Sequence, residues 1–361
     1  MIKRLTPLIV SLAAGLALAG CGSTPDRPPP AAASPPPGSV VIHAAGTDYA
    51  APIYQELGNL VQRRGLTLNY QLLGTPRLAP GPHPSSVPLV ASSSSQSLGA
   101  DPLLHSETYV PVAFGALAIV YDLPGIRGLR LSAAALAAIF SGQVVHWNAG
   151  VIARCNPGLL LPATPITVAH LSTSSVLTQL LTSYLAAGSR RWRRTLGSGA
   201  RINWPTGTSV SDETAMIGLA TGTPGVIGYA SQATALQDKL VVAKLRNPAG
   251  TYVAPTLTAT RAVGMQPHAP GQLSLSTIDA PGLATYPIAA EAYAMTFTDL
   301  CASGFSPAES LGVQRLLGFL IGSAGQTLVA RFSFAPLPRG LRASALDAVR
   351  QLSCASQPLS S

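Results

Sequence analysis

The chain has 361 residues and a mass of 36.9 kDa, a length that suits two ordinary domains or one large two-lobed domain. Hydrophobic residues make up 47% and charged residues only 10%, the reverse of the balance that disorder requires, so most of the chain folds. The formal net charge of +9 comes with a single basic cluster that contains an aromatic residue, and the four cysteines form no CxxC pair. We therefore expect no nucleic-acid partner, no metal site and no cofactor.

The first twenty residues have the pattern of a secretory signal. Two basic residues near the start precede an apolar stretch, residues 5–19, which is too short to span a bilayer comfortably. The sequence Leu-Ala-Gly-Cys at residues 18–21 resembles a bacterial lipobox. The resemblance implies removal of residues 1–20, lipidation of Cys21, and a membrane-anchored chain in the periplasm or on the outer cell surface. The alternative is a cysteine in an ordinary secretory signal.

Residues 21–39 follow as a stretch rich in proline, alanine and serine. Such a sequence favours extended polyproline II structure and cannot bury a core. We interpret it as a tether between the lipid and the folded part. A proline motif that binds a partner is the alternative.

From residue 40 on, short apolar runs alternate with helical patterns. The runs predict strands at residues 40–42, 66–72, 109–123, 166–169 and 225–229. The helical patterns lie at residues 51–63, 132–140, 176–185, 311–320 and 343–352, with Ser132 as an N-cap. The alternation predicts an α/β fold with mainly parallel sheets.

The common enzyme motifs are missing from the sequence. It contains no GxSxG, no HExxH, no Walker loop and no GxGxxG after a predicted strand. The six histidines lack metal-ligand spacing, and fourteen acidic residues leave little material for paired carboxylate chemistry. We therefore expect a protein that is not an enzyme.

Several segments between residues 40 and 352 resemble, in order and spacing, the phosphate-binding protein of Pst-type ABC importers. They are AGTDYAAPIY at 45–54, IFSGQ at 139–143 with WN at 147–148, NPG at 156–158, NWP at 203–205, TPGVIGY at 223–229 and APLP at 335–338. The resemblance implies a type II periplasmic binding-protein fold: two α/β lobes, two hinge crossovers near residues 112–115 and 254–258, and a ligand cleft between the lobes. It also implies phosphate or another small oxyanion as ligand, and ABC permease subunits as partners.

The resemblance further assigns residues 40–113 and 257–355 to the first lobe, residues 114–256 to the second, and residues 356–361 to a tail. Once Cys21 is lipidated, three cysteines and three possible pairings remain. Cys155 falls in the second lobe, whereas Cys301 and Cys354 both fall in the first. The resemblance therefore implies a disulfide between Cys301 and Cys354, which an exported chain permits, and a free Cys155.

The ligand residues that the resemblance implies are carried over position by position. Thr75 and Ser175 keep the hydroxyls of the family, and Tyr49 keeps a backbone N–H. Asp48 stands at a threonine position and Ser93 at the position of an aspartate that selects a protonated ligand. Within residues 171–177 only Ser175 matches the family motif, and Ser174 beside it is a further candidate.

Three departures from the family pattern weaken the expected binding of phosphate. Leu171 replaces the arginine, and Val176 with Leu177 replaces a Gly-Thr pair, while Asp48 adds a negative charge. We therefore expect phosphate to bind at least tenfold more weakly than in a member with the full motif. The open alternative is a degenerate homologue that binds another ligand or acts as an envelope interaction protein.

Simpler interpretations exist for the other conspicuous residues. The hydroxyls of residues 172–175 are those of an ordinary helix cap. Residues 190–194 suit a solvated helix end with Trp192 packed beneath it. Trp147 and Trp204 suit the core better than a ligand site.

Overall fold

The computed structural model describes residues 39–72, 87–92, 107–267, 269 and 272–359. Pro36–Ser361 form a compact unit of their own. The predicted signal peptide, Cys21, residues 21–38 of the predicted tether, and the predicted ligand residues Thr75 and Ser93 lie outside the described residues. In the part of the chain that is described, no helix combines the length and apolarity needed to cross a membrane.

The described residues form an eight-stranded sheet. Its outer pairs are parallel, as predicted, but its centre is not, because β11 runs antiparallel to both β3 and β4, and β4 runs antiparallel to β8. The prediction of mainly parallel sheets was therefore wrong for the central strands. In spatial order the strands are β2 (Leu66–Leu72), β1 (Val40–Gly46), β3 (Leu89–Ser92), β11 (Ala289–Phe297), β4 (Glu107–Tyr121), β8 (Val226–Ser231), β6 (Thr167–Leu171) and β7 (Thr208–Val210).

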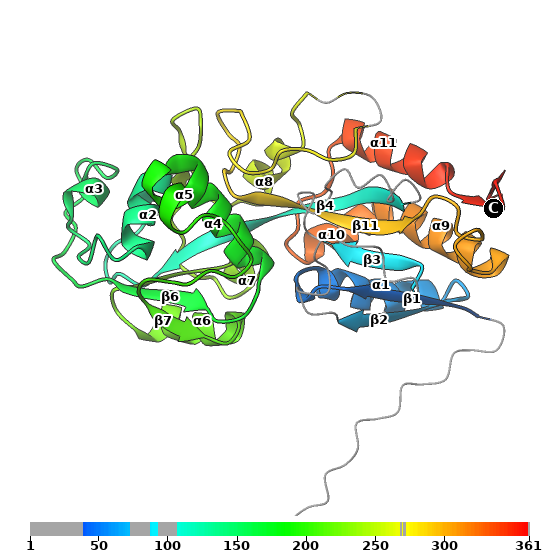
Figure 1. Ribbon diagram of the computed structural model, residues 1–361, viewed down its shortest axis with the longest axis horizontal. Helices are drawn as coiled ribbons and strands as arrows, with labels where there is room; N and C mark the ends of the chain where they lie inside the picture. Colours follow the sequence, from blue (N-terminus) through cyan, green and yellow to red (C-terminus); the bar gives the residue numbers. More distant parts are fainter. Residues whose placement is uncertain (1–38, 73–86, 93–106, 268, 270–271, 360–361) are drawn as a thin grey trace, which may run out of the picture. The chain divides into compact units, whose positions relative to one another are not determined.

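Strand β4 joins two hydrophobic cores. Its first half pairs with β11 and contributes side chains such as Val112 to a core around β1, β3, α1 and α9, here called the first core. Its second half pairs with β8 and contributes Ile119 to a core around β6, β8, α2 and α4, the second core. The change falls near Gly115, and Figure 1 shows β4 and β11 running together between the two groups of elements.

Helices cover the sheet, and polar N-caps start most of them. Ser132 accepts a hydrogen bond from the Ala135 N–H at 3.2 Å, which confirms the predicted cap. Ser306 and Glu309 form a capping box at α9. The helices are η1 (Asp48–Ala50), α1 (Ala51–Gln62), α2 (Ala133–Phe140), α3 (Gly150–Ala153), α4 (Val176–Gly188), α5 (Arg190–Thr195), α6 (Glu213–Gly222), α7 (Gln232–Gln237), α8 (Leu257–Val263), α9 (Pro307–Ile321), α10 (Ser323–Arg331) and α11 (Arg339–Arg350).

Two small sheets and a disulfide complete the fold. The predicted bond between Cys301 and Cys354 is present, with Cα atoms 4.6 Å apart, and Cys155 is a buried free thiol. Trp192 is buried under α5 and donates its ring N–H to the Gly197 carbonyl at 2.7 Å. The small sheets are β10 (Tyr252–Val253), β9 (Lys244–Arg246) and β5 (Arg130–Leu131), and β12 (Ser353–Cys354) with β13 (Gln357–Pro358).

Candidate functional site

A cavity of about 330 Å³ lies where three helices begin: α4, α6 and α7. The rest of the described lining comes from two places: residues just before and at the start of α1, and residues just after α10. The lining residues are Tyr49, Pro52, Leu171, Thr173, Ser174, Ser175, Val176, Leu177, Ser211, Asp212, Glu213, Thr214, Ser231, Ala233, Thr234, Gln237, Phe332 and Phe334.

The N-terminus of α4 is held by a short hydrogen-bond network. Ser175 caps the helix, accepting a hydrogen bond from the Leu177 N–H at 3.1 Å. Leu171, at the end of β6, donates its N–H to the Tyr229 hydroxyl at 3.1 Å, and that hydroxyl pairs with Thr178 Oγ1 at 2.7 Å. The strand and the first helical turn are thus fixed relative to each other. A helix start of this kind carries N–H donors and partial positive charge.

The N-terminus of α6 carries an ionised cap. Asp212 accepts a hydrogen bond from the Ala215 N–H at 2.9 Å and another from the Ser211 hydroxyl at 2.8 Å. These bonds, the Ala215 N–H foremost, hold the pKa of Asp212 below its usual range. Asp212 is therefore negatively charged at neutral pH, at the edge of the cavity.

The N-terminus of α7 already has an anionic partner within the protein. Ser231 caps this helix by accepting from the Thr234 N–H at 3.1 Å. The Glu213 carboxylate accepts from the Ser231 N–H at 3.2 Å, from the Ser231 hydroxyl at 3.1 Å and from the Thr234 hydroxyl. The start of α6 thus has an acidic cap, and the start of α7 is hydrogen-bonded to Glu213 of another helix, whereas α4 has a serine cap and no acid in its first turn.

Aromatic side chains form the other wall. The rings of Tyr49 and Phe334 meet edge to face, with centroids 5.2 Å apart. The Tyr49 hydroxyl lies against Gly115 of β4, where any Cβ would overlap it, so a glycine is required at that point of the strand. Burial, and then the negative charge of Glu213, raise the pKa of Tyr49, so its hydroxyl stays protonated.

The charges around the cavity do not match those of a strong anion site. Among the described residues, the lining contains two carboxylates, Asp212 and Glu213, and no lysine or arginine. Positive potential comes from helix N-termini, and hydroxyls supply neutral hydrogen bonds. Within the described ranges, no group of three or more His, Cys, Asp or Glu residues is arranged to hold a metal ion. The arrangement suits reversible binding of a small polar ligand.

The predicted ligand residues fall into two groups. Tyr49, Ser174 and Ser175 line the cavity, and Asp48 lies beside Tyr49 in η1. Leu171, which occupies the arginine position of the resemblance, also lines it. Thr75 and Ser93 lie outside the described residues, so their roles stay predictions.

Sequence reasoning missed most of the remaining lining. Ser231 and Thr234 begin α7, and their sequence, Ser-Gln-Ala-Thr, carries only a weak capping signal. Asp212 and Glu213 were not among the predicted site residues. A stronger signal was available there, because an acidic pair directly before an apolar helix is typical of a helix start.

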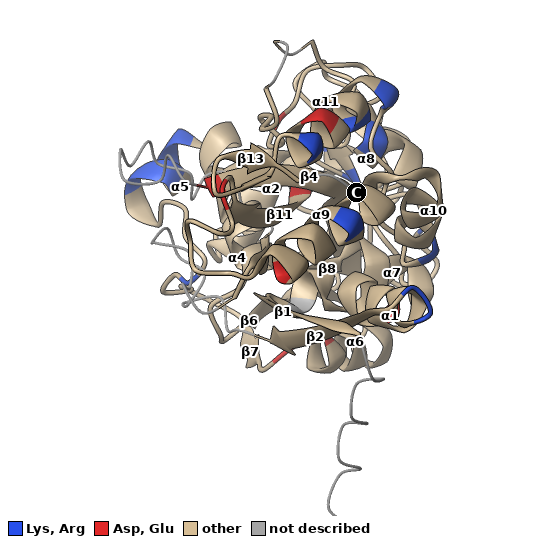
Figure 2. Ribbon diagram, turned by 90° about the vertical axis from the view of Figure 1, so that its right-hand side faces the viewer, with Lys and Arg blue, Asp and Glu red and all other residues tan. Residues whose placement is uncertain are grey.

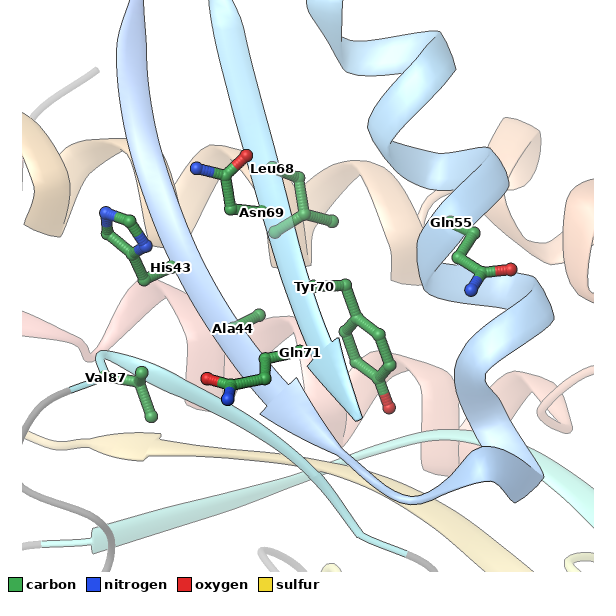
Figure 3. A pocket seen from close by; sticks show the side chains of 8 residues that line it. All are labelled: His43, Ala44, Gln55, Leu68, Asn69, Tyr70, Gln71 and Val87. Carbon is green, nitrogen blue, oxygen red and sulfur yellow. The ribbon is translucent and has the colours of Figure 1, made fainter. Parts of the chain in front are cut away.

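A second hollow, of about 450 Å³, lies at β1 and β2 (Figure 3). Its polar side chains include His43 of β1 and Asn69 and Gln71 of β2. Among its described lining residues there is no helix start and no Asp, Glu, Lys or Arg. This hollow is larger than the cavity at α4, but no helix N-terminus in its described lining supplies N–H donors to it. The cavity at α4 is therefore the better candidate for a ligand site.

Comparison with known proteins agrees with this architecture. A family model described as the PBP superfamily domain matches residues 90–307. The ancestral soluble variant of the human phosphate-binding protein shares the fold with a TM-score of 0.64 at 18% identity, over 89% of this chain and 96% of that one. A putative phosphate ABC transporter substrate-binding protein from Clostridium perfringens gives 0.57 at 12% identity, over 83% and 100%. The predicted two-lobed α/β binding-protein fold is thereby confirmed.

Curated relatives narrow the class. The phosphate-binding protein PstS of Xylella fastidiosa strain 9a5c is 30% identical over 258 residues, which cover 70% of both chains. PstS of Methanocaldococcus jannaschii is 28% identical over 259 residues, or 67% of each chain. The chain spans 60 to 70% of the length of five such relatives.

The fold and the cavity therefore define a solute-binding protein of the PBP superfamily. Within that class the chain belongs to the PstS family, as predicted from the sequence. This is a family of solute-binding proteins of ABC transporters and not of enzymes.

Proposed function

We propose that this chain is the lipid-anchored, extracytoplasmic binding component of a phosphate-type ABC importer, and that it holds phosphate or a related small oxyanion without chemistry. One observation carries the proposal: the N-terminus of α4 opens into the cavity with no acid of its own, beside Ser174 and Ser175. A helix start with hydroxyls is a binding site for an oxyanion. The names of the relatives, phosphate-binding proteins, support the same ligand class.

The proposed ligand contacts are the six predicted residues. Ser174 and Ser175 offer hydroxyls at α4, Tyr49 offers its backbone N–H, and Asp48 stands at the threonine position, where its carboxylate would accept a proton carried by the ligand. Thr75 and Ser93 complete the proposed set. On this assignment the ligand bridges the two sides of the cavity, and permease subunits receive it when the cavity opens.

Binding of phosphate by this cavity is expected to be weak. Asp212 and Glu213 repel a divalent anion, and Leu171 brings no charge where the family has an arginine. A hydrogen bond to a charged group is worth about 1.5 to 3 kcal/mol, or roughly one to two decades of affinity. We therefore propose at least tenfold weaker binding than in a relative with the arginine.

Calorimetry with a matched pair of variants tests the site. Ser175 and Ser189 are both N-cap serines, of α4 and of the neighbouring α5, but only Ser175 lines the cavity. Each change to alanine should lower stability by about 1 kcal/mol. Only Ser175→Ala should also weaken phosphate binding, by about tenfold. Unchanged affinity in Ser175→Ala, with phosphate bound by the parent protein, contradicts the assignment.

A second candidate keeps the fold but changes the ligand. Two carboxylates and no lysine or arginine among the described lining residues favour a ligand that donates hydrogen bonds. A thermal-shift screen with phosphate, sulfate and organic oxyanions separates the candidates. Stabilisation by a hydroxylated organic anion and none by phosphate would favour this second function.

The anchor belongs to the same proposal. We infer lipidation at Cys21, a tether over residues 21–39, and lobes divided as the resemblance implies. Palmitate labelling should mark the parent chain and disappear in Cys21→Ser. Equal labelling of both proteins contradicts the anchor and leaves the binding function untouched.

A further inference from the structure

The three-stranded sheet of β5, β9 and β10 has a basic outer face. Lys244 and Arg246 alternate with the buried Leu245, and Arg130 alternates with the buried Leu131. Arg130 is the register partner of Lys244, so both side chains lie on the same side of the sheet. We call Arg130, Lys244 and Arg246 the basic face.

The basic face is part of a larger charge asymmetry. Residues 114–256 hold eleven Lys and Arg against four Asp and Glu, a net charge of +7, whereas residues 40–113 and 257–355 hold nine of each. All eleven of these basic residues are exposed. Among the described residues the one ion pair joins Arg350 to Asp347, on α11, so no carboxylate neutralises the basic face through a salt bridge.

Two exposed leucines lie on loops tied to this sheet. The Asn156 side chain accepts from the Arg130 N–H and donates to its carbonyl, each at 2.8 Å, and so holds the loop that carries Leu160. Asn247, directly after β9, donates to the carbonyls of Gly282 at 2.9 Å and Leu283 at 3.2 Å. Leu160 is 93% exposed and Leu283 is 73% exposed, the two largest values among the exposed large hydrophobic residues described.

We propose that the basic face and these two leucines form a docking surface for an anionic phospholipid bilayer. Basic side chains are attracted to anionic headgroups, and single exposed leucines on loops can enter the interface between headgroups and acyl chains. A protein partner is less well matched, because a stable protein interface needs a continuous apolar centre and not two separate leucines. The proposal requires neither lipidation of Cys21 nor a ligand in the cavity.

The docking surface differs from the other basic part of the same segment. Helix α5 carries Arg190, Arg191, Arg193 and Arg194, all exposed, and appears largely blue in Figure 2. Its aromatic residue, Trp192, is buried and unavailable to a membrane. None of the described large exposed hydrophobic residues belongs to α5. Helix α5, with four arginines against the three basic residues of the basic face, therefore provides a control that is at least as positively charged but has no exposed leucine.

Cosedimentation with vesicles tests the proposal, using Pro36–Ser361, which form a compact unit on their own. The protein should bind vesicles containing about one-third phosphatidylglycerol and not vesicles of phosphatidylcholine alone. Each lost charge should weaken binding by about fivefold, so Arg130→Gln with Lys244→Gln and Arg246→Gln should weaken it on the order of a hundredfold. Leu160→Ser with Leu283→Ser should weaken it by about tenfold.

The control is Arg191→Gln with Arg193→Gln and Arg194→Gln, which removes the same charge from α5. This variant should keep binding within about threefold of the parent. Equal losses in both triple variants mean that binding follows net charge and overturn the proposed surface. Absence of binding to the anionic vesicles, or equal binding to both kinds of vesicle, also overturns it. Circular dichroism of each variant verifies the fold.

Discussion

The half of the molecule around the first core and the half around the second core differ in their covalent cross-links and in the groups that they contribute to the cavity. The first is fastened by the disulfide at Cys301 and Cys354 and contributes aromatic rings, Tyr49 and Phe334, to the cavity. The second has no disulfide among its described residues and contributes three capped helix starts and two carboxylates. Its segment also carries the net charge. The comparison shows that the capped helix starts and the surface charge are concentrated in one half, whereas the other supplies aromatic side chains to the cavity.

The largest expected effect comes from removing the disulfide of the first half. Cys301→Ser with Cys354→Ser should lower the free energy of unfolding by about 4 kcal/mol, because the bond closes a loop of 53 residues in the unfolded chain. Urea unfolding of the variant and the parent measures the difference. A reductant should destabilise the parent and leave the variant unchanged. A loss below about 1 kcal/mol contradicts the role of the bond.

A buried acid makes the first half sensitive to pH. Glu291, in β11, accepts hydrogen bonds from the Leu275 N–H at 3.1 Å and from the Tyr293 hydroxyl, while its Oε1 has no hydrogen-bond partner among the described residues. Burial raises the pKa of Glu291 to about 8. The native protein therefore holds a proton that the unfolded chain releases between pH 4.5 and about 8.

Stability should thus fall as pH rises through this window, on the order of a few kcal/mol, and level off above it for this group. Glu291→Gln should flatten the fall, because the amide cannot ionise. Thermal unfolding from pH 5 to 9 measures both proteins. Glu56→Gln, at a carboxylate that is not buried, should keep the slope of the parent. A slope that survives in Glu291→Gln assigns the pH dependence to another group.

Local signals predicted the elements whose structure depends on neighbouring residues. The strand at residues 66–72 and the helix start at residue 176 are where the sequence indicated, because alternation and a serine cap are local features. Strand β11 was not predicted. The strand, Ala289–Phe297, is buried although it contains a glutamate, and pairing with β4 decides its conformation.

The candidate site was only partly accessible to sequence reasoning for the same reason. Ser174 and Ser175 precede a recognisable helix, so their position at a helix start could be inferred. Glu213 faces the start of a different helix, α7, which only the tertiary fold brings to it. No local sequence pattern shows that the Glu213 carboxylate accepts hydrogen bonds from Ser231 at the start of α7.

Placing a positive charge at Leu171, in the lining of the cavity, tests whether the helix starts around the cavity bind an anion. Leu171→Arg with Asp48→Thr should strengthen phosphate binding by roughly one to two decades, the value of a charged hydrogen bond. Leu171 is buried at the lining of the cavity, so Leu171→Met, which keeps the volume without the charge, is the control. Calorimetry should show a gain only for the arginine variant. If the folded arginine variant shows no gain, the cavity does not close on an anion.

The smallest expected effect concerns the carboxylate at the edge of the cavity. Asp212→Asn keeps an N-cap that accepts from the Ala215 N–H, since asparagine caps helices as well as aspartate does. The change removes one exposed negative charge, so phosphate affinity should rise by only about two- to threefold. The gain should shrink as salt is added, because exposed charges are screened over about 10 Å at 0.1 M ionic strength. A gain that persists at 1 M salt would mean that Asp212 contacts the ligand directly. The carboxylate would then weaken anion binding through that contact and not through long-range electrostatic repulsion.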